Sequence, residues 1–141
     1  MPRTLLTILI VVGTLVPAAA EVRIKSSPGG QIGQFLEMFE SVRETGERVV
    51  IDGPCLSACT LVLGVVPRNR ICVTPRAVLG FHAAWRPAGR GRTVPEHEAT
   101  QLMMDIYPSE VRGWILRRGG LNGHMIWLRG PELAAMYQRC A

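Results

Sequence analysis

The chain has 141 residues and a formal net charge of +5, and a length of this order fits one domain with a single core. Lys25 is its only lysine, so the basic charge comes from arginines. These are scattered and lack the interleaved aromatic residues of a nucleic-acid-binding stripe, so no nucleic-acid partner is expected. Beyond the first twenty residues, no segment is long and apolar enough to predict a membrane helix.

The first twenty residues predict a cleavable signal peptide. Arg3 supplies a positive charge, residues 5–16 form an apolar run, and 18–20 are three alanines of the size that signal peptidase accepts. The run is too short to span a hydrocarbon layer of about 30 Å. We expect cleavage after Ala20, a domain at 21–141, and export to a periplasm or out of the cell. The alternative is an uncleaved N-terminal anchor.

Apolar spacing predicts alternating strands and helices in the first half of the domain. Short β-branched runs indicate buried strands, and apolar side chains at helical spacing indicate helices. The expected elements are a strand at 22–25, a helix at 31–45, a strand at 49–51, a buried helix at 57–66, and strands at 70–73 and 77–81. This order is typical of parallel βαβ units, so the fold class is α/β with an open parallel sheet.

The second half reads as a loop followed by helices. We expect a Gly/Pro/Arg loop at 86–93, a helix at 95–107, a helix capped by Ser109 that ends at 119–120, and a helix at 131–137. Some apolar residues of this region either pack on the core or form an exposed face for self-assembly; these are Met103, Met104, Ile106 and Trp114.

Four cysteines follow the predicted signal peptide: Cys55, Cys59, Cys72 and Cys140. An even number in a small exported domain predicts two disulfides, for which three pairings are possible. A zinc site is the alternative, but no histidine or further cysteine lies near Cys55 and Cys59 at metal-ligand spacing. We therefore expect no metal and no other cofactor.

Three segments can meet beyond the carboxyl ends of the strands, where open α/β sheets bind ligands. They are the glycine turn 28–30, residues 55–59 and residues 80–82. Ser57 would begin the buried helix, close to free backbone N–H groups. With the glycine turn these donors would form an oxyanion hole, and His82 would accept the serine proton. The plainer interpretation is a capping serine and a structural histidine.

The same segments resemble a known family. Residues 24–30, IKSSPGG, are similar to the glycine-turn motif of the Clp protease proteolytic subunit, within the Clp/crotonase superfamily. CLSACT resembles the nucleophile motif, and 80–82, GFH, resembles the histidine segment. WLRGPEL at 127–133 is similar to the stretch that follows the family's aspartate. The resemblance covers 22–141 and is greatest to small exported bacterial Clp-like proteins with a C-x-S-A-C motif.

The resemblance implies a ββα-type fold, trimmed at its N-terminus. It implies Ser57 as nucleophile, His82 as base, and Ala58 with Gly30 or Gly29 as oxyanion donors. The expected activity is that of a serine hydrolase, specifically a peptidase, with a polypeptide substrate or partner. Because the protein is expected to be exported, no ATP-dependent unfoldase would assist it.

One departure from the family concerns the triad acid, which would fall near His124 and Met125. Neither is a carboxylate, so the charged imidazole would lack its usual partner. The alternatives are a Ser57–His82 dyad, His124 as a substitute, or Asp105 or Glu98 from the helical insertion at 94–118. The domain could also be inactive and serve in peptide binding or in a homo-oligomer.

The resemblance also bears on the disulfides. It places the strand of Cys72 beside the C-terminal segment of Cys140 and so implies a Cys72–Cys140 bridge. A Cys55–Cys59 bridge would then bracket Ser57 and fix the geometry of that turn.

Overall fold

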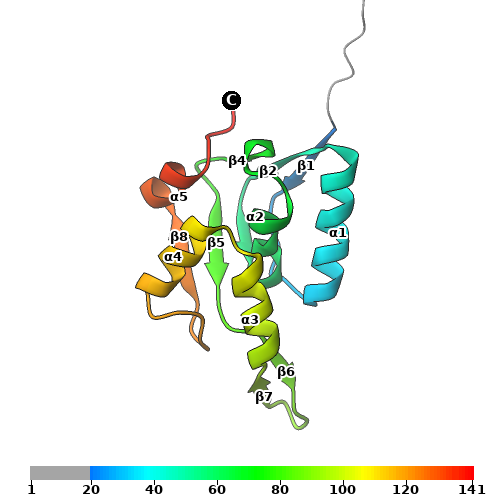
Figure 1. Ribbon diagram of the computed structural model, residues 1–141, viewed down its shortest axis with the longest axis vertical. Coiled ribbons are helices and arrows are strands. Elements are labelled where there is room, and N and C mark those ends of the chain that lie inside the picture. Colours follow the sequence, from blue (N-terminus) through cyan, green and yellow to red (C-terminus); the bar gives the residue numbers. More distant parts are fainter. Residues whose placement is uncertain (1–19) are drawn as a thin grey trace, which may run out of the picture.

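The computed structural model describes residues 20–141, and the predicted signal peptide lies, but for Ala20, outside these residues. The protein is a single α/β domain built on two small sheets and a projecting hairpin (Figure 1). The α/β class predicted from the sequence is confirmed. The single open parallel sheet is wrong, because the strands divide between two sheets.

The first sheet is parallel and has the order β1-β2-β4. Its strands are β1 (Glu21–Ile24), β2 (Arg48–Ile51) and β4 (Ile71–Val73). Helix α1 (Ile32–Thr45) runs alongside β1 and buries Phe39 and Val42 (Figure 1). It ends at Gly46, whose φ of 79° suits glycine. These elements agree with the predicted strands and helix to within one or two residues.

The second sheet begins where the chain leaves β2 through Asp52 and Gly53. Its strands are β3 (Pro54–Leu56), β5 (Val78–Phe81) and β8 (Ile126–Arg129), in the order β3-β5-β8. β3 pairs with β5 in parallel, whereas β8 pairs with β5 antiparallel. β3 and β8 were not expected from the sequence, since three or four residues are too few to show a strand period.

The predicted buried helix at 57–66 is wrong as a single α-helix. It is a 3-10 helix, η1 (Ser57–Leu61), followed by one short turn, α2 (Val62–Val65). Both lie at the centre of the domain, and residues 58–63 are all buried. A second 3-10 turn, η2 (Arg68–Arg70), leads into β4. Ser57 is the first residue of η1 but has a φ of 55°, so the right-handed helical geometry starts after it.

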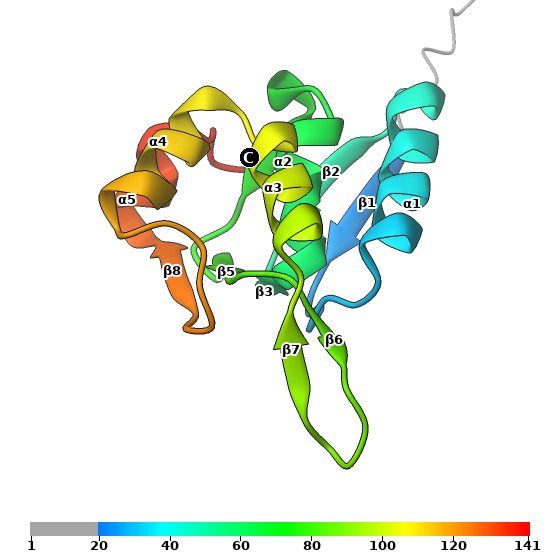
Figure 2. The same cartoon turned by 60° about the horizontal axis from the view of Figure 1, so that its bottom comes forward.

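Three further helices complete the domain: α3 (His97–Ile106), α4 (Ser109–Arg117) and α5 (Gly130–Met136). Helices α4 and α5 lie near β8, whereas α3 lies in front of α2 (Figure 2). Ser109 was expected to cap α4, but Pro108 occupies the cap position and no side chain caps the helix. Met103 and Trp114 are 1% and 2% exposed, so these two residues pack in the core and do not form an exposed face.

The predicted loop at 86–93 is confirmed for residues 88–92, which form the turn of a β-hairpin, but residues 86, 87 and 93 belong to its strands. Strands β6 (Trp85–Pro87) and β7 (Thr93–Pro95) pair antiparallel. The turn between them contains three residues at positive φ, which are Gly89, Arg90 and Gly91. The hairpin projects from the body of the domain below α3 (Figure 2). Its Trp85 is 55% exposed.

Two disulfides cross-link the domain, Cys55–Cys59 and Cys72–Cys140. They confirm the expected pairing. The second bridge closes where the C-terminal segment joins the first sheet: Val73 pairs with Arg139, and the N–H of Cys140 donates to the Val73 carbonyl at 3.1 Å. Two disulfides fit an exported protein. Within residues 20–141 no helix is apolar and long enough to cross a membrane.

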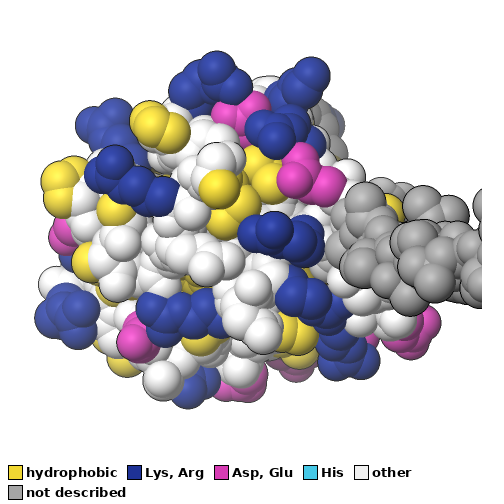
Figure 3. All heavy atoms as spheres, turned by 90° about the horizontal axis from the view of Figure 1, so that it is seen from above, with side chains coloured by type: hydrophobic (Ala, Val, Ile, Leu, Met, Phe, Trp, Pro, Cys, Tyr) yellow, Lys and Arg dark blue, Asp and Glu magenta, His cyan; other side chains and the backbone are white. Residues whose placement is uncertain are grey.

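A buried carboxylate joins the two sheets at Asp52, whose side chain is 3% exposed. It accepts hydrogen bonds from Arg76, Thr74 and Arg23 at 2.6 to 3.1 Å. The hydrogen bonds from Arg76 and Thr74 lower the pKa of Asp52 to about 2. Elsewhere, on the face seen in Figure 3, arginine side chains are dispersed among neutral and acidic ones.

Candidate active site

Ser57 occupies a strained backbone position between β3 and η1. Its φ is 55°, and among residues 20–141 only Arg90 is another non-glycine residue with positive φ. A side chain in this left-handed region costs about 1–2 kcal/mol. Such strain persists where the surrounding structure enforces it, and it is concentrated at functional sites. The turn resembles the sharp strand-to-helix elbow that exposes nucleophilic serines.

The glycine turn packs directly against this elbow. Gly29 has a φ of 86°, and a Cβ there would lie 2.5 Å from the Leu56 carbonyl oxygen and 2.7 Å from the Cβ of Ser57. The approach is fixed by two hydrogen bonds, from the Ser27 N–H to the Pro54 carbonyl and from the Leu56 N–H to the Ser27 carbonyl, at 2.8 and 3.0 Å. Only glycine fits this position.

One groove brings together most of the residues singled out from the sequence. Ser57, His82, Gly29 and Gly30 all line a cavity of about 580 Å³. Its remaining walls come from the hairpin, α3 and the start of α1, with Ile32, Trp85, Pro87, Glu96, Ala99 and Met103 among them. The three separate segments identified in the sequence therefore do face one space.

Backbone N–H groups near Ser57 come from Ala58, which is fully buried, and from the glycine turn, which lines the groove. Ala58 lies in the first turn of η1, so its N–H has no partner within that helix. Its nitrogen is 3.1 Å from the point where a Cβ on Gly29 would lie, which places it on the side of the glycine turn. The Gly29 N–H is directed at the Ser27 Oγ at 3.4 Å, which leaves Gly30 as the less engaged donor of the turn.

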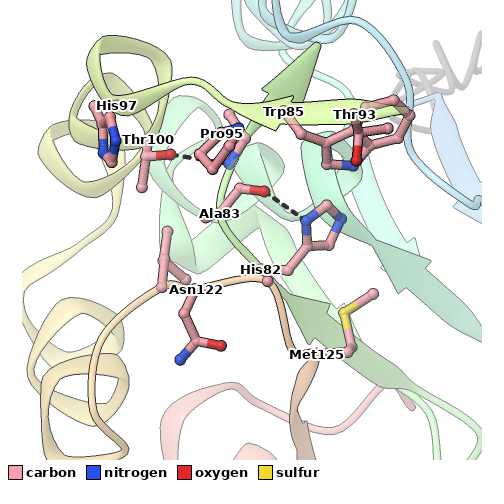
Figure 4. A pocket seen from close by; sticks show the side chains of 12 residues that line it. His82, Ala83, Trp85, Thr93, Pro95, His97, Thr100, Asn122 and Met125 are labelled. Carbon is pink, nitrogen blue, oxygen red and sulfur yellow. Dashed lines mark hydrogen bonds between the residues drawn. The ribbon is translucent and has the colours of Figure 1, made fainter. Parts of the chain in front are cut away.

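His82 is held by its own neighbour. Its Nδ1 lies 2.7 Å from the carbonyl oxygen of Ala83, and Figure 4 shows the imidazole turned toward that oxygen. A carbonyl only accepts, so Nδ1 carries the proton, and in the neutral ring Nε2 is left as an acceptor. Across the part of the chain that the structure describes, no hydrogen bond joins His82 to Ser57, a gap that is common in ligand-free sites.

The candidate third residues do not reach the groove. Asp105 accepts a hydrogen bond from Gln101 on the exposed side of α3, at 2.9 Å. His124 is exposed, and its N–H donates to the Asn122 side chain at 2.8 Å. Glu96 is the one carboxylate that the groove contains, and it pairs with Arg86 at 3.1 Å. A backbone carbonyl therefore occupies the position at His82 that a triad acid would take.

A second cavity, of about 660 Å³, is also lined by His82 (Figure 4). Its walls include His97, Thr100, Asn122 and Met125. It shares His82, Ala84 and Trp85 with the Ser57 groove. The two cavities are therefore neighbours.

Sequence reasoning missed several residues of the groove, notably Trp85, Glu96, Met103 and the Ala83 carbonyl. Trp85 and Glu96 lie in or next to the hairpin. The sequence indicates this hairpin only weakly, by two very short segments on either side of a stretch rich in glycine and arginine. Among residues 20–141 no group of three or more His, Cys, Asp or Glu side chains is arranged to hold a metal ion.

No family model matches the chain, and no curated protein matches it. Among solved structures, a peptidase from Plasmodium falciparum has a related backbone arrangement, with a TM-score of 0.49 and 5% identity over 84% of this chain and 75% of that chain. A likeness this distant carries no argument about chemistry, which has to come from the site itself.

Proposed function

We propose that the protein is an exported serine hydrolase that cleaves polypeptides, with Ser57 as nucleophile and His82 as general base. The strained Ser57 elbow, which opens on the same groove as His82, carries this proposal. A serine that merely capped a helix would gain nothing from a left-handed backbone.

In the proposed reaction, the Oγ of Ser57 attacks a carbonyl carbon while Nε2 of His82 accepts the hydroxyl proton. The same imidazolium then protonates the leaving group, and water releases the acyl group from Ser57. The Ala58 and Gly30 N–H groups receive the developing oxyanion, and a single such donor is worth about 3–4 kcal/mol in known enzymes.

The Ala83 carbonyl takes over part of the role of the missing acid. It holds the Nδ1–H tautomer that leaves Nε2 free to act as base. A neutral carbonyl stabilises the imidazolium less than a carboxylate does, so we expect slower turnover than in a Ser-His-Asp enzyme.

A polypeptide substrate follows from the resemblance to the Clp proteolytic subunit and suits the walls of the groove. Ile32 and Trp85 offer apolar surface beside Ser57 for one or two side chains. Without an unfoldase, the protein would act on short, unfolded or exposed segments.

A fluorophosphonate probe tests the nucleophile, applied to the oxidised protein starting at Glu21. We expect labelling of the wild type and of Ser109→Ala, a matched variant at an exposed serine, but not of Ser57→Ala. His82→Ala should slow labelling by about 10²- to 10⁴-fold, whereas His97→Ala, in the neighbouring cavity, should not. A folded wild-type protein that resists the probe would refute the proposal.

Two further measurements separate the parts of the proposal. Incubation with a mixture of unstructured peptides, followed by mass spectrometry, should show cleavage that is lost in Ser57→Ala. N-terminal sequencing of protein from the cell exterior or periplasm should begin at Glu21; a chain that still carries residues 1–20 would contradict the predicted cleavage.

A second candidate function is a non-catalytic peptide-binding domain. The observation that favours it is that the groove offers His82 no free carboxylate. In that case peptides would bind in the groove and shield Trp85 fluorescence without being cut, and Ser57→Ala would bind them as the wild type does.

A further inference from the structure

A buried pair of hydroxyl groups holds the peptide unit that follows Ser57. The Oγ1 of Thr60 donates a hydrogen bond to the Ser57 carbonyl oxygen at 2.7 Å. The hydroxyl of Tyr107 lies 2.6 Å from the same Oγ1. Thr60 is fully buried and Tyr107 is 2% exposed, so water does not compete for the bond between their hydroxyl groups.

The direction of this relay follows from counting protons. A hydroxyl has a single proton, and that of Thr60 is directed at the Ser57 carbonyl. Tyr107 must therefore donate to Thr60. Burial raises the pKa of Tyr107, which keeps its hydroxyl protonated as the relay requires.

Fixing the Ser57 carbonyl also fixes the Ala58 N–H. Both belong to one planar trans peptide unit, in which C=O and N–H point in opposite directions. With the carbonyl drawn toward buried Thr60, the N–H points away from Thr60. The Ala58 nitrogen lies 3.1 Å from the point where a Cβ on Gly29 would lie, so this peptide unit adjoins the glycine turn.

Tyr107 is itself firmly placed. It follows α3, and its ring packs edge-on against Phe81 with centroids 5.4 Å apart. Phe81 directly precedes His82, so one aromatic contact touches the histidine segment while the hydroxyl relay reaches the serine segment.

We infer that Thr60 and Tyr107 are positioning residues that aim the Ala58 N–H at the oxyanion of the reaction. This inference rests on the proposed serine hydrolase activity and adds two residues that touch neither the substrate nor Ser57 Oγ. It also gives the 94–118 segment a role inside the site.

The test is the kinetics of fluorophosphonate labelling, separated into the maximal rate kinact and the half-saturation constant KI. Thr60→Val keeps the shape but removes the hydroxyl. We expect kinact to fall about 10- to 30-fold, less than the 10²–10³ for deleting a donor, with KI unchanged. Tyr107→Phe should lower kinact by about 3-fold, and Thr60→Ser should restore the wild-type rate.

Two comparisons exclude a merely structural role. The double variant Thr60→Val/Tyr107→Phe should match Thr60→Val alone, because the relay passes through Thr60. Tyr137→Phe removes another buried tyrosine hydroxyl, away from the groove, and should leave kinact unchanged at whatever cost in melting temperature.

The outcomes are distinguishable. An unlabelled, folded wild type overturns the proposed function and this inference with it. A labelled wild type with Thr60→Val at the same kinact overturns the inference alone, as does a loss in Tyr137→Phe equal to that in Tyr107→Phe. If Thr60→Val does not fold, Tyr107→Phe and its control decide the question.

Discussion

The two disulfides should separate stability from reactivity. Cys72–Cys140 joins residues 68 apart in sequence, whereas Cys55–Cys59 joins residues only 4 apart. Removing each pair by Cys→Ala substitution tests which bridge stabilises the fold and which one shapes the site.

The stability cost follows from the loop that each bridge closes. The chain-entropy relation gives about 4.4 kcal/mol for Cys72–Cys140 and about 2 kcal/mol for Cys55–Cys59. With an m-value of about 1.5 kcal/mol/M, the urea midpoint should fall by about 2.9 M and about 1.3 M respectively. The first loss is a large share of the stability of a typical domain.

The effect of the two bridges on the reactivity of Ser57 should be the reverse of their effect on stability. Cys55 and Cys59 flank Ser57 in sequence and are both buried, so their bridge constrains the strained elbow. We expect Cys55→Ala/Cys59→Ala to lose most fluorophosphonate labelling while remaining folded. Cys72→Ala/Cys140→Ala should label normally at a temperature where circular dichroism shows it folded.

Urea unfolding followed by circular dichroism, together with labelling rates on the same samples, measures both quantities. Equal midpoint losses for the two variants would refute the loop-length reasoning. Normal labelling without the Cys55–Cys59 bridge would refute its role at the elbow, since Ser57 would then keep its geometry unaided.

Other substitutions test the elbow and the buried carboxylate. Gly29→Ala should cost about 2–5 kcal/mol, combining left-handed strain with overpacking against Leu56, and it should abolish labelling; a urea titration near wild type would contradict the close packing. Ser57→Gly should be more stable than Ser57→Ala by about 0.5–1 kcal/mol in the same assay, because glycine is unstrained at this φ; the reverse order would exclude strain. Asp52 has a pKa near 2 in the fold against 3.8 when unfolded, so the unfolded chain binds more protons in between and stability should fall as pH drops through that window. The melting temperature of Asp52→Asn should not fall with pH in this window. If the melting temperatures of the two proteins change with pH in the same way, the hydrogen bonds from arginine to Asp52 do not stabilise the fold.

The sequence predicted best the features that depend on neighbouring residues in the chain. The helix at 32–45 follows from five apolar residues at helical spacing and ends at a glycine, so local rules suffice. The meeting of Ser57, His82 and the glycine turn was predicted from strand ends and from resemblance, and the structure places them in one groove.

The features that it missed depend on distant partners or on very short elements. The hairpin strands have three residues each, and the division into two sheets depends on how the chain turns at Gly53. The bond between Thr60 and Tyr107 joins residues 47 apart, and neither residue type signals the other. The sequence predicted a side chain as the partner of the His82 imidazole. The partner in the structure is the backbone carbonyl of Ala83, and because every residue carries a carbonyl, no sequence pattern reveals it.

The spacing of the paired cysteines implies an order of events during maturation. Cys55 and Cys59 are only 4 residues apart, so their bond can close while the chain is still open, at little entropic cost. Cys140 must wait until the C-terminal segment has joined β4. The turn around Ser57 would then be fixed early, and the Cys72–Cys140 bridge, which holds the C-terminal segment, would form last.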